Sequence, residues 1–318
     1  MKKLFLAAAL LVAATAAFAR TDAIGLVPND AVSVGVVKLA ELRTSPLSGA
    51  LFQQTAHATM DADAAAFLSD AGLQPSKDVD VVVFATSPRT ALGSDADVLI
   101  ALDGRFNVER LGTALTTRGA VSKNGYFLLP DKHESGKQPV VAFPDAHLAL
   151  IGSENAVVEA LASRAAGGTS FFTASGLGRD LARVDPKATA WVLIDVARAQ
   201  RIVGAPKMHT DSMPGAAVAS ALKSVSTVAL WATDTGDQIK LGAFGLAHDA
   251  ETLQLLEDTL RGALSAMRLA VQDKSPDLVP TLRRFTVSRS DDSVTVSGSV
   301  PAETFRTWAA KHEHHETK

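Results

Sequence analysis

Residues 224–271 read SVSTVALWATDTGDQIKLGAFGLAHDAETLQLLEDTLRGALSAMRLAV. Apolar residues alternate with polar or small ones over residues 228–232 and again over residues 239–243. A period of two is typical of a half-buried strand. The intervening Asp-Thr-Gly-Asp at 234–237 is turn chemistry, because Asp bonds local amides and Gly accepts a positive φ. The first half of the stretch therefore predicts a β-hairpin.

The second half of the stretch predicts a long helix. Asp249 stands where an N-cap is expected, with a carboxylate that accepts hydrogen bonds from free first-turn amides. Apolar residues then follow at steps of three and four, at Leu253, Leu256, Leu260, Leu264, Met267 and Val271. Residues at this spacing share one helix face. We expect a sheet or another helix to cover this seam, and a groove for a lipid or peptide along Leu253–Val271 is the alternative.

A looser copy of the same plan lies near residues 79–118. The strand at 31–39 matches that at 189–196, residues 79–103 match 224–246, and a helix capped by Asn107 matches the one at Asp249. The pattern predicts an internal repeat. The fold class is α+β, with two similar rounds of mostly antiparallel sheet and helices packed on one face. We expect a first unit at residues 20–174 and a second at 175–311.

The N-terminus predicts export. Lys2 and Lys3 precede a continuous apolar run at 4–17, and Ala17-Phe18-Ala19 is an A-x-A cleavage site. Residues 1–19 therefore have the pattern of a bacterial secretory signal peptide. Cleavage would leave 29 basic against 34 acidic residues, a net charge of −5. No later stretch is apolar for long enough to span a bilayer, so we expect a periplasmic or secreted protein with no membrane span after signal cleavage.

Composition narrows the function classes further. The chain has 47% hydrophobic and 20% charged residues, which indicates a folded protein with a sizeable core. It has no long basic run and only 5% aromatic residues, which argues against a nucleic-acid surface. It has no cysteine, so disulfides, thiol catalysis and Cys-based metal sites are excluded.

The entry segment Leu26-Val27-Pro28-Asn29-Asp30-Ala31, just after the signal peptide, leads into a strand through a P-x-D step. Together with the general α+β layout, it resembles a loose group of uncharacterised exported bacterial proteins. The resemblance implies export and an α+β fold, and it brings no catalytic residues to this chain.

Motifs for catalysis are missing from the sequence. It contains no G-x-S-x-G nucleophile elbow, and its glycines do not follow the spacing of a phosphate-binding loop. We therefore assign no catalytic and no cofactor-binding residue, and we expect no cofactor. The candidate metal ligands are His312, His314 and His315 in the tail at 312–318, where imidazoles and carboxylates could bind Zn²⁺, Ni²⁺ or Cu²⁺. We favour the simpler interpretation, in which residues 312–318 are a solvated, disordered tail with only adventitious affinity for metal ions.

These observations favour an exported, soluble, non-enzymatic protein that binds an envelope protein partner or a small apolar ligand. Two other hypotheses stay open. One is a periplasmic metal-binding protein that uses its His-rich C-terminus, and the other is a hydrolase whose site the sequence does not reveal.

Overall fold

The computed structural model describes residues 23–45, 62–89, 96–130, 138–168, 170–203, 221, 224–304 and 307. The predicted signal peptide and the tail at 312–318 lie outside these residues. Within them, no helix combines the length and the apolar content needed to cross a bilayer.

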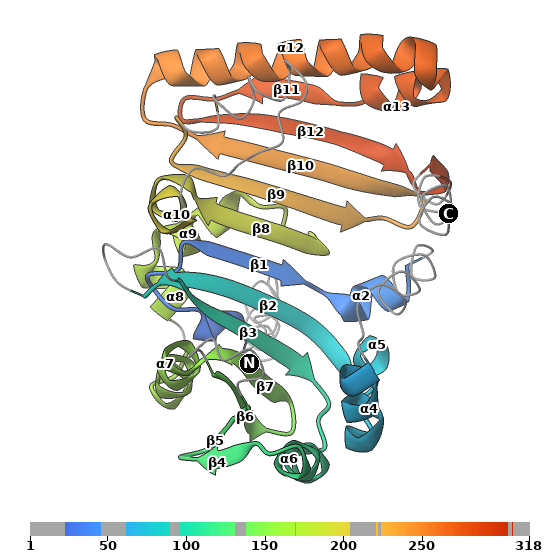
Figure 1. Cartoon of the computed structure of the whole chain (residues 1–318). Helices are drawn as coiled ribbons and strands as arrows, with labels where there is room; N and C mark the ends of the chain where they lie inside the picture. The colour runs from blue at the N-terminus through green and yellow to red at the C-terminus, as the bar shows by residue number, and fades with distance from the viewer. Residues whose placement is uncertain are drawn as a thin grey trace, which may run out of the picture.

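The molecule is organised around one antiparallel sheet (Figure 1), with strand order β11-β12-β10-β9-β8-β1-β2-β3-β7-β6-β5-β4. The strands are β1 (Ser33–Val37), β2 (Val79–Pro88), β3 (Ala96–Gly104), β4 (Val121–Lys123), β5 (Tyr126–Leu128), β6 (Pro139–Asp145), β7 (Leu148–Ser153), β8 (Ala190–Asp195), β9 (Thr227–Asp234), β10 (Gln238–Leu246), β11 (Thr286–Arg289) and β12 (Ser293–Pro301). The predicted α+β class and the antiparallel sheet are confirmed.

The helices connect and cover these strands. They are α2 (Leu39–Arg43), α4 (Ala62–Ala71), α5 (Pro75–Asp78), α6 (Val108–Thr117), α7 (Glu154–Ala165), α8 (Ser170–Ala174), α9 (Gly176–Asp180), α10 (Val196–Val203), α12 (Ala250–Lys274) and α13 (Val279–Arg283). Short 3₁₀ turns are η2 (Ile24–Leu26), η3 (Leu181–Arg183) and η4 (Pro276–Leu278). The predicted caps are confirmed in α6 and α12, where Asn107 accepts a hydrogen bond from the Arg110 amide at 3.0 Å and Asp249 accepts one from the Thr252 amide at 2.7 Å.

Strands β1 and β8 pair at the middle of the sheet and join its two halves. Their register places Val34 opposite Leu193 and Val36 opposite Trp191. From this junction outward, the first half runs β1, β2, β3, and after α6 the chain returns to place β7 beside β3. The second half runs β8, β9, β10, and after α12 it returns to place β12 beside β10. The expected boundary at 174/175 falls between α8 and α9, and the sheet continues across both halves.

One face of the sheet, called the first face here, carries the main core. Its alternate residues include Val34, Val83, Leu99, Leu150 and Leu193, all 1% exposed or less. They form one cluster with apolar residues of η2, α7, α8 and α9. Strand periodicity sends the intervening side chains to the opposite, second face.

The second face carries the helices that follow the two matched hairpins. In the first half, Leu111 of α6 packs in a cluster with Ala149 of β7, which is joined by Phe67 of α4. In the second half, Leu253 and Leu256 of α12 pack with residues of β9, β11 and β12. Helices thus lie on both faces of the sheet, with α6 and α12 sharing one of them, and the predicted packing of helices on one face alone is wrong.

The long seam of α12 is only partly covered. Leu253, Leu256 and Leu264 are at most 8% exposed, whereas Met267 is 48% exposed. Beyond Leu264, the helix is accompanied by η4 and α13, where Arg268 donates hydrogen bonds to the carbonyl oxygens of Leu282 and Phe285. The predicted seam is therefore a core contact over its first turns and a more exposed surface towards its C-terminal end.

Glycines in the sheet make room for aromatic rings on the neighbouring strand. Gly242 is paired with Trp231, and a Cβ added to Gly242 would lie 2.1 Å from atoms of the indole ring. Gly35 is paired with Phe84 in the same way, and a Cβ added to Gly35 would lie 2.0 Å from the phenyl ring. A side chain at either position would displace a ring that is packed between strands.

We expect Gly242→Ala to lower the free energy of unfolding by about 1–3 kcal/mol, the usual range for overpacking a filled site. Gly262→Ala is the matched control, because Gly262 lies within α12 with no heavy atom within 4 Å of its added Cβ. That change should raise stability by about 0.5–1 kcal/mol, since alanine is the better helix former. Urea unfolding of both variants measures the difference, and stabilisation by both would contradict the packing.

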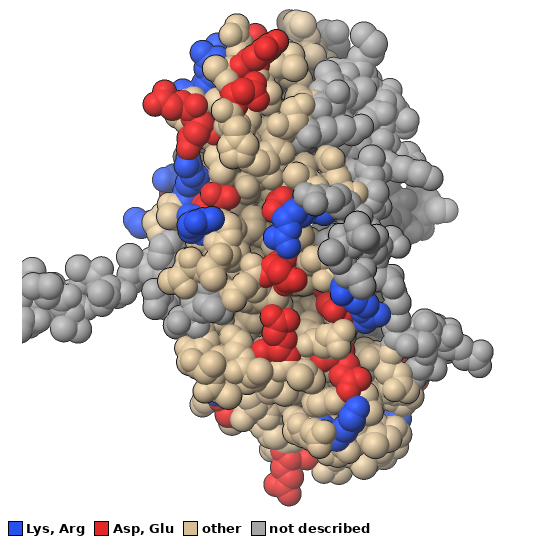
Figure 2. All heavy atoms as spheres, turned by 90° about the vertical axis from the view of Figure 1, so that its left-hand side faces the viewer, with Lys and Arg blue, Asp and Glu red and all other residues tan. Residues whose placement is uncertain are grey.

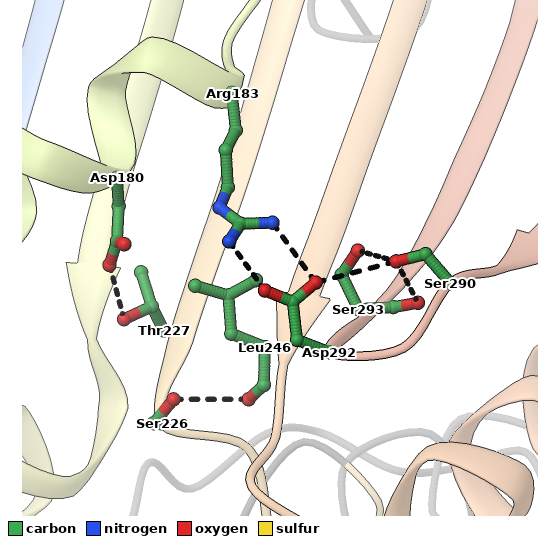
Figure 3. A network of polar contacts seen from close by, with 8 residues as sticks. All are labelled: Asp180, Arg183, Ser226, Thr227, Leu246, Ser290, Asp292 and Ser293. Atoms are coloured by element: carbon green, nitrogen blue, oxygen red, sulfur yellow. Dashed lines mark hydrogen bonds and ion pairs between the residues drawn. The ribbon is translucent and has the colours of Figure 1, made fainter.

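A polar network ties the segment before β8 to the turn between β11 and β12 (Figure 3). Arg183 of η3 bonds both carboxylate oxygens of Asp292 at 2.5 and 3.1 Å, and Asp180 accepts a hydrogen bond from the Thr227 hydroxyl at 2.9 Å. The Arg183 guanidinium is the main reason that the pKa of Asp292 lies below its usual value. The ionised carboxylate is thus the form that the folded state stabilises.

A carboxyl group whose pKa is lowered by folding adds stability above its unfolded-state pKa, about 3.9 for Asp, and this contribution disappears as pH falls through the folded-state value. We therefore expect Asp292→Asn to be less stable than wild type at pH 7, with the difference shrinking in acid below about pH 4. Thermal unfolding across this pH range measures it. Asp258→Asn, at an exposed position of α12, controls for loss of a surface charge. A difference that stays constant down to about pH 2 would contradict the assignment.

Candidate functional site

A cavity of about 1260 Å³ lies on the second face of the sheet in the first half of the molecule. Strands β3, β7 and β6 supply its floor, and α4 and α6 supply its opposite wall. Its volume is above the ~300–1,000 Å³ typical of small-molecule sites. Most of its lining residues are apolar, so it is the strongest candidate for a functional site.

Strand register builds the floor. On β3, β7 and β6, the side chains of alternate residues line the cavity, while those between them enter the main core on the first face. The floor residues are Val98 and Leu102 of β3, Ala149 and Ile151 of β7, and Val141 and Phe143 of β6. Their neighbours Leu99 and Leu150 are 1% and 0% exposed in the main core. These strands are thus apolar on both sides.

Helices α4 and α6 line the cavity opposite the floor and contact each other. Leu111 and Leu115, one turn apart on α6, line the cavity together with Phe67 of α4. Arg118 just after α6 fixes the pair of helices, because its guanidinium lies 5.5 Å from the Phe67 ring centroid and 2.5 Å from the carboxylate of Asp70. The wall is therefore held by a cation–π contact and an ion pair as well as by apolar packing.

One end of the cavity is apolar and the other is polar. Leu73, Leu102 and Phe106 line the apolar end. At the other end, β2 finishes, β3 starts and α7 begins, and the lining residues there are Arg89, Gln138, Ser153, Glu154 and Asn155. The cavity thus runs from an apolar interior to a rim of hydrogen-bonding groups.

Ser153 occupies the N-cap position of α7, but its side chain does not cap the helix. Its hydroxyl instead accepts a hydrogen bond from the backbone amide of Val98 at 3.0 Å. The bond attaches the start of α7 to the neighbouring strand β3 at the polar end of the cavity.

The charged residues of the polar end are paired within the protein. Arg89 lies 3.0 Å from Asp97, a side chain that is only 11% exposed. Glu154 lies 2.8 Å from the Lys123 amine and also accepts a hydrogen bond from the Tyr126 hydroxyl. The hydrogen bond from Lys123, followed by that from Tyr126, holds the pKa of Glu154 below its ordinary value.

Acidic residues gather near this end of the sheet. Burial, followed by the fields of Asp30 and Asp97, raises the pKa of Glu159 on α7. The side of the molecule where β3 begins is at the left of Figure 1 and faces the viewer in Figure 2. Figure 2 shows acidic side chains running down the middle of this face, with basic side chains scattered beside them.

The sheet covers the first turns of the seam Leu253–Val271, as the sequence predicts, and the cavity lies beside another helix. Along α12, Leu253, Leu256 and Leu264 are packed into the core, and the large cavity lies beside α6 instead. The sequence did hold a signal for it, since residues 97–103 and 140–143 are apolar at positions on both strand faces. Such strands need cover on both sides, and helix α6 is shorter than α12.

The candidate metal ligands His312, His314 and His315 lie outside the described residues, so the metal hypothesis stays a prediction. Among the residues that the structure does describe, no group of three His, Asp or Glu side chains is arranged to hold a metal ion.

No known protein family and no curated protein sequence matches the chain. Among solved structures, the chain is similar to TP0453 in crystal form I, with a TM-score of 0.52, 10% identity, and coverage of 92% of this chain and 98% of that chain. Crystal form III of TP0453 gives a TM-score of 0.48 at 11% identity, covering 90% of this chain and 96% of that chain. At this level of identity the similarity concerns the fold alone.

Proposed function

We propose that this chain is an exported, non-enzymatic protein that binds a small apolar ligand in the cavity between β3, β7, β6 and helices α4 and α6. The observation that carries the proposal is the cavity itself, which is large, lined mostly by apolar side chains and bounded by regular elements on both sides. A preformed apolar hollow with a few polar groups at one end is the usual design of a small-molecule site. The signal-peptide pattern at 1–19 supports export to the periplasm or the medium.

The sequence leaves two kinds of partner open, an envelope protein and a small apolar ligand. The ligand is favoured because the apolar surface in question is concave and lies between a sheet and two helices. A protein partner would reach it only by inserting a side chain or a segment, whereas a small molecule can be enclosed. Enclosure removes the ligand's surface from water, which stabilises the complex by about 25 cal/mol per Å² of apolar area.

We also propose that the two halves are an internal repeat that has diverged on the second face. The matched order of strands and helices around the β1–β8 junction supports the repeat. In the first half, α6 spans 10 residues and the cavity lies beneath it, whereas in the second half α12 spans 25 residues and its leucines fill the equivalent layer. The proposal assigns ligand binding to the first half.

We expect the mature chain, residues 20–318, to bind one molecule of Nile red, an uncharged dye whose emission shifts to the blue in apolar surroundings. Ile151→Trp should weaken this binding about tenfold or more, a change of at least ~1.4 kcal/mol, because the indole fills the middle of the floor. Fluorescence titration measures both proteins, and a urea unfolding curve verifies that the variant is folded.

Leu255→Trp is the matched control, because Leu255 is 58% exposed on α12 and does not line the cavity. It should bind the dye as wild type does. If a folded Ile151→Trp variant binds with unchanged affinity, the cavity is not the binding site. If the wild-type chain does not bind the dye, the proposed function is wrong.

A further inference from the structure

The polarity of the cavity changes along the strand direction. From the register, the row nearest the polar end contains Val98, Ser153 and Pro139, and the deepest floor row contains Leu102, Ala149 and Phe143. Four residues of β3 separate these rows, a distance of ~13 Å at ~3.3 Å per residue. A bilayer's hydrocarbon core is ~30 Å thick, so one acyl chain extends over ~15 Å. The apolar floor therefore matches the length of a hydrocarbon chain.

Two amide side chains line the polar end and are accessible to a ligand. Gln138 and Asn155 line this end and are exposed to solvent, and no side-chain hydrogen bond joins either of them to another described residue. Each amide has two N–H donors and one acceptor oxygen. A hydroxyl, ester or amide head group is complementary to them.

The charged side chains at this end already have partners within the protein. Arg89 is bonded to Asp97, and Glu154 is bonded to Lys123 and Tyr126. Arg118, further along the lining, is paired with Asp70. A charged head group entering here would lose water without gaining an unpaired opposite charge, which is unfavourable.

The surroundings add a second penalty for an anion. The carboxylates of Asp30 and Asp97 lie close enough to Glu159 to raise its pKa. Acidic side chains continue over this face in Figure 2. A cationic head group would find Asp97 and Glu154 already hydrogen-bonded to Arg89, Lys123 and Tyr126. It would have to replace these existing contacts.

We infer that the ligand is an uncharged amphiphile, whose hydrogen-bonding head contacts Gln138 and Asn155 while its hydrocarbon chain lies over Val98, Ile151 and Leu102. This inference rests on the proposed function and names the class of its ligand. The head group stays at the rim where α7 begins, and the chain points towards Phe106 at the apolar end. Selection against ions of the same chain length then has two sources. The charged side chains at this end already have partners, which disfavours head groups of either sign, and the acidic surroundings disfavour an anion further.

The test is displacement of Nile red from the full mature chain by three dodecyl probes at about pH 7.5, each below its micelle concentration. The probes are 1-dodecanol, dodecanoate and dodecyltrimethylammonium. We expect dodecanol to displace the dye at a concentration about tenfold lower than either ion does. Equal displacement by all three, or stronger displacement by an ion, overturns the inference while the proposed function stands. Displacement by none of them overturns both.

A variant tests where the head group lies. Asn155→Leu should weaken dodecanol binding about threefold to tenfold, in line with the loss of ~1 kcal/mol for a hydrogen bond, and should leave dodecane binding unchanged. Gln254→Leu is the matched control, an exposed amide on helix α12 that does not line the cavity. Equal weakening of dodecanol and dodecane by Asn155→Leu would show a structural effect, and no weakening of either would show that the head lies elsewhere. Both results contradict the placement.

Discussion

Apolar residues on both faces of β3, β6 and β7 are the constraint on which this architecture depends. On the first face, Leu99 and Leu150 need the cover that α7, α8 and α9 provide. On the second face, Leu102, Ile151 and Phe143 need a separate cover, and α4 and α6 provide it only partly. The hydrophobic effect requires both layers, and incomplete cover on the second face leaves the cavity.

The two halves of the sheet differ in how their second face is covered, with a filled layer in one half and a hollow layer in the other. In the second half, the 25-residue helix α12 packs Leu253 and Leu256 against residues of β9, β11 and β12. In the first half, the 10-residue helix α6 is held near α4 by Arg118, which bonds Asp70 and stacks on Phe67. The β1–β8 ladder joins these halves in one sheet, so the hollow is supported by a continuous framework.

Much of the fold could be predicted from the sequence, because its signals are local. The Asp249 cap, the turn at 234–237 and the period of two in the hairpins depend on near neighbours, and the structure has each of them. The cavity beside α6 could not be predicted from the sequence, because its position depends on distant contacts. The leucine seam of α12 predicts cover by a sheet or a helix, and strands β9, β11 and β12 provide it over the first turns. Likewise, the hydrogen bond between Ser153 and Val98 depends on the pairing of β3 with β7, which are distant in the sequence.

We propose that the first half of the molecule holds a small, uncharged ligand with a hydrocarbon chain. The most direct measurement is native mass spectrometry of the untagged chain, isolated without detergent from the cells that produce it. We predict a bound mass of a few hundred daltons, lost when Ile151→Trp is isolated in the same way and retained by Leu255→Trp. A bare protein mass in all three preparations, or a bound mass that persists in the folded Ile151→Trp variant, would contradict the account.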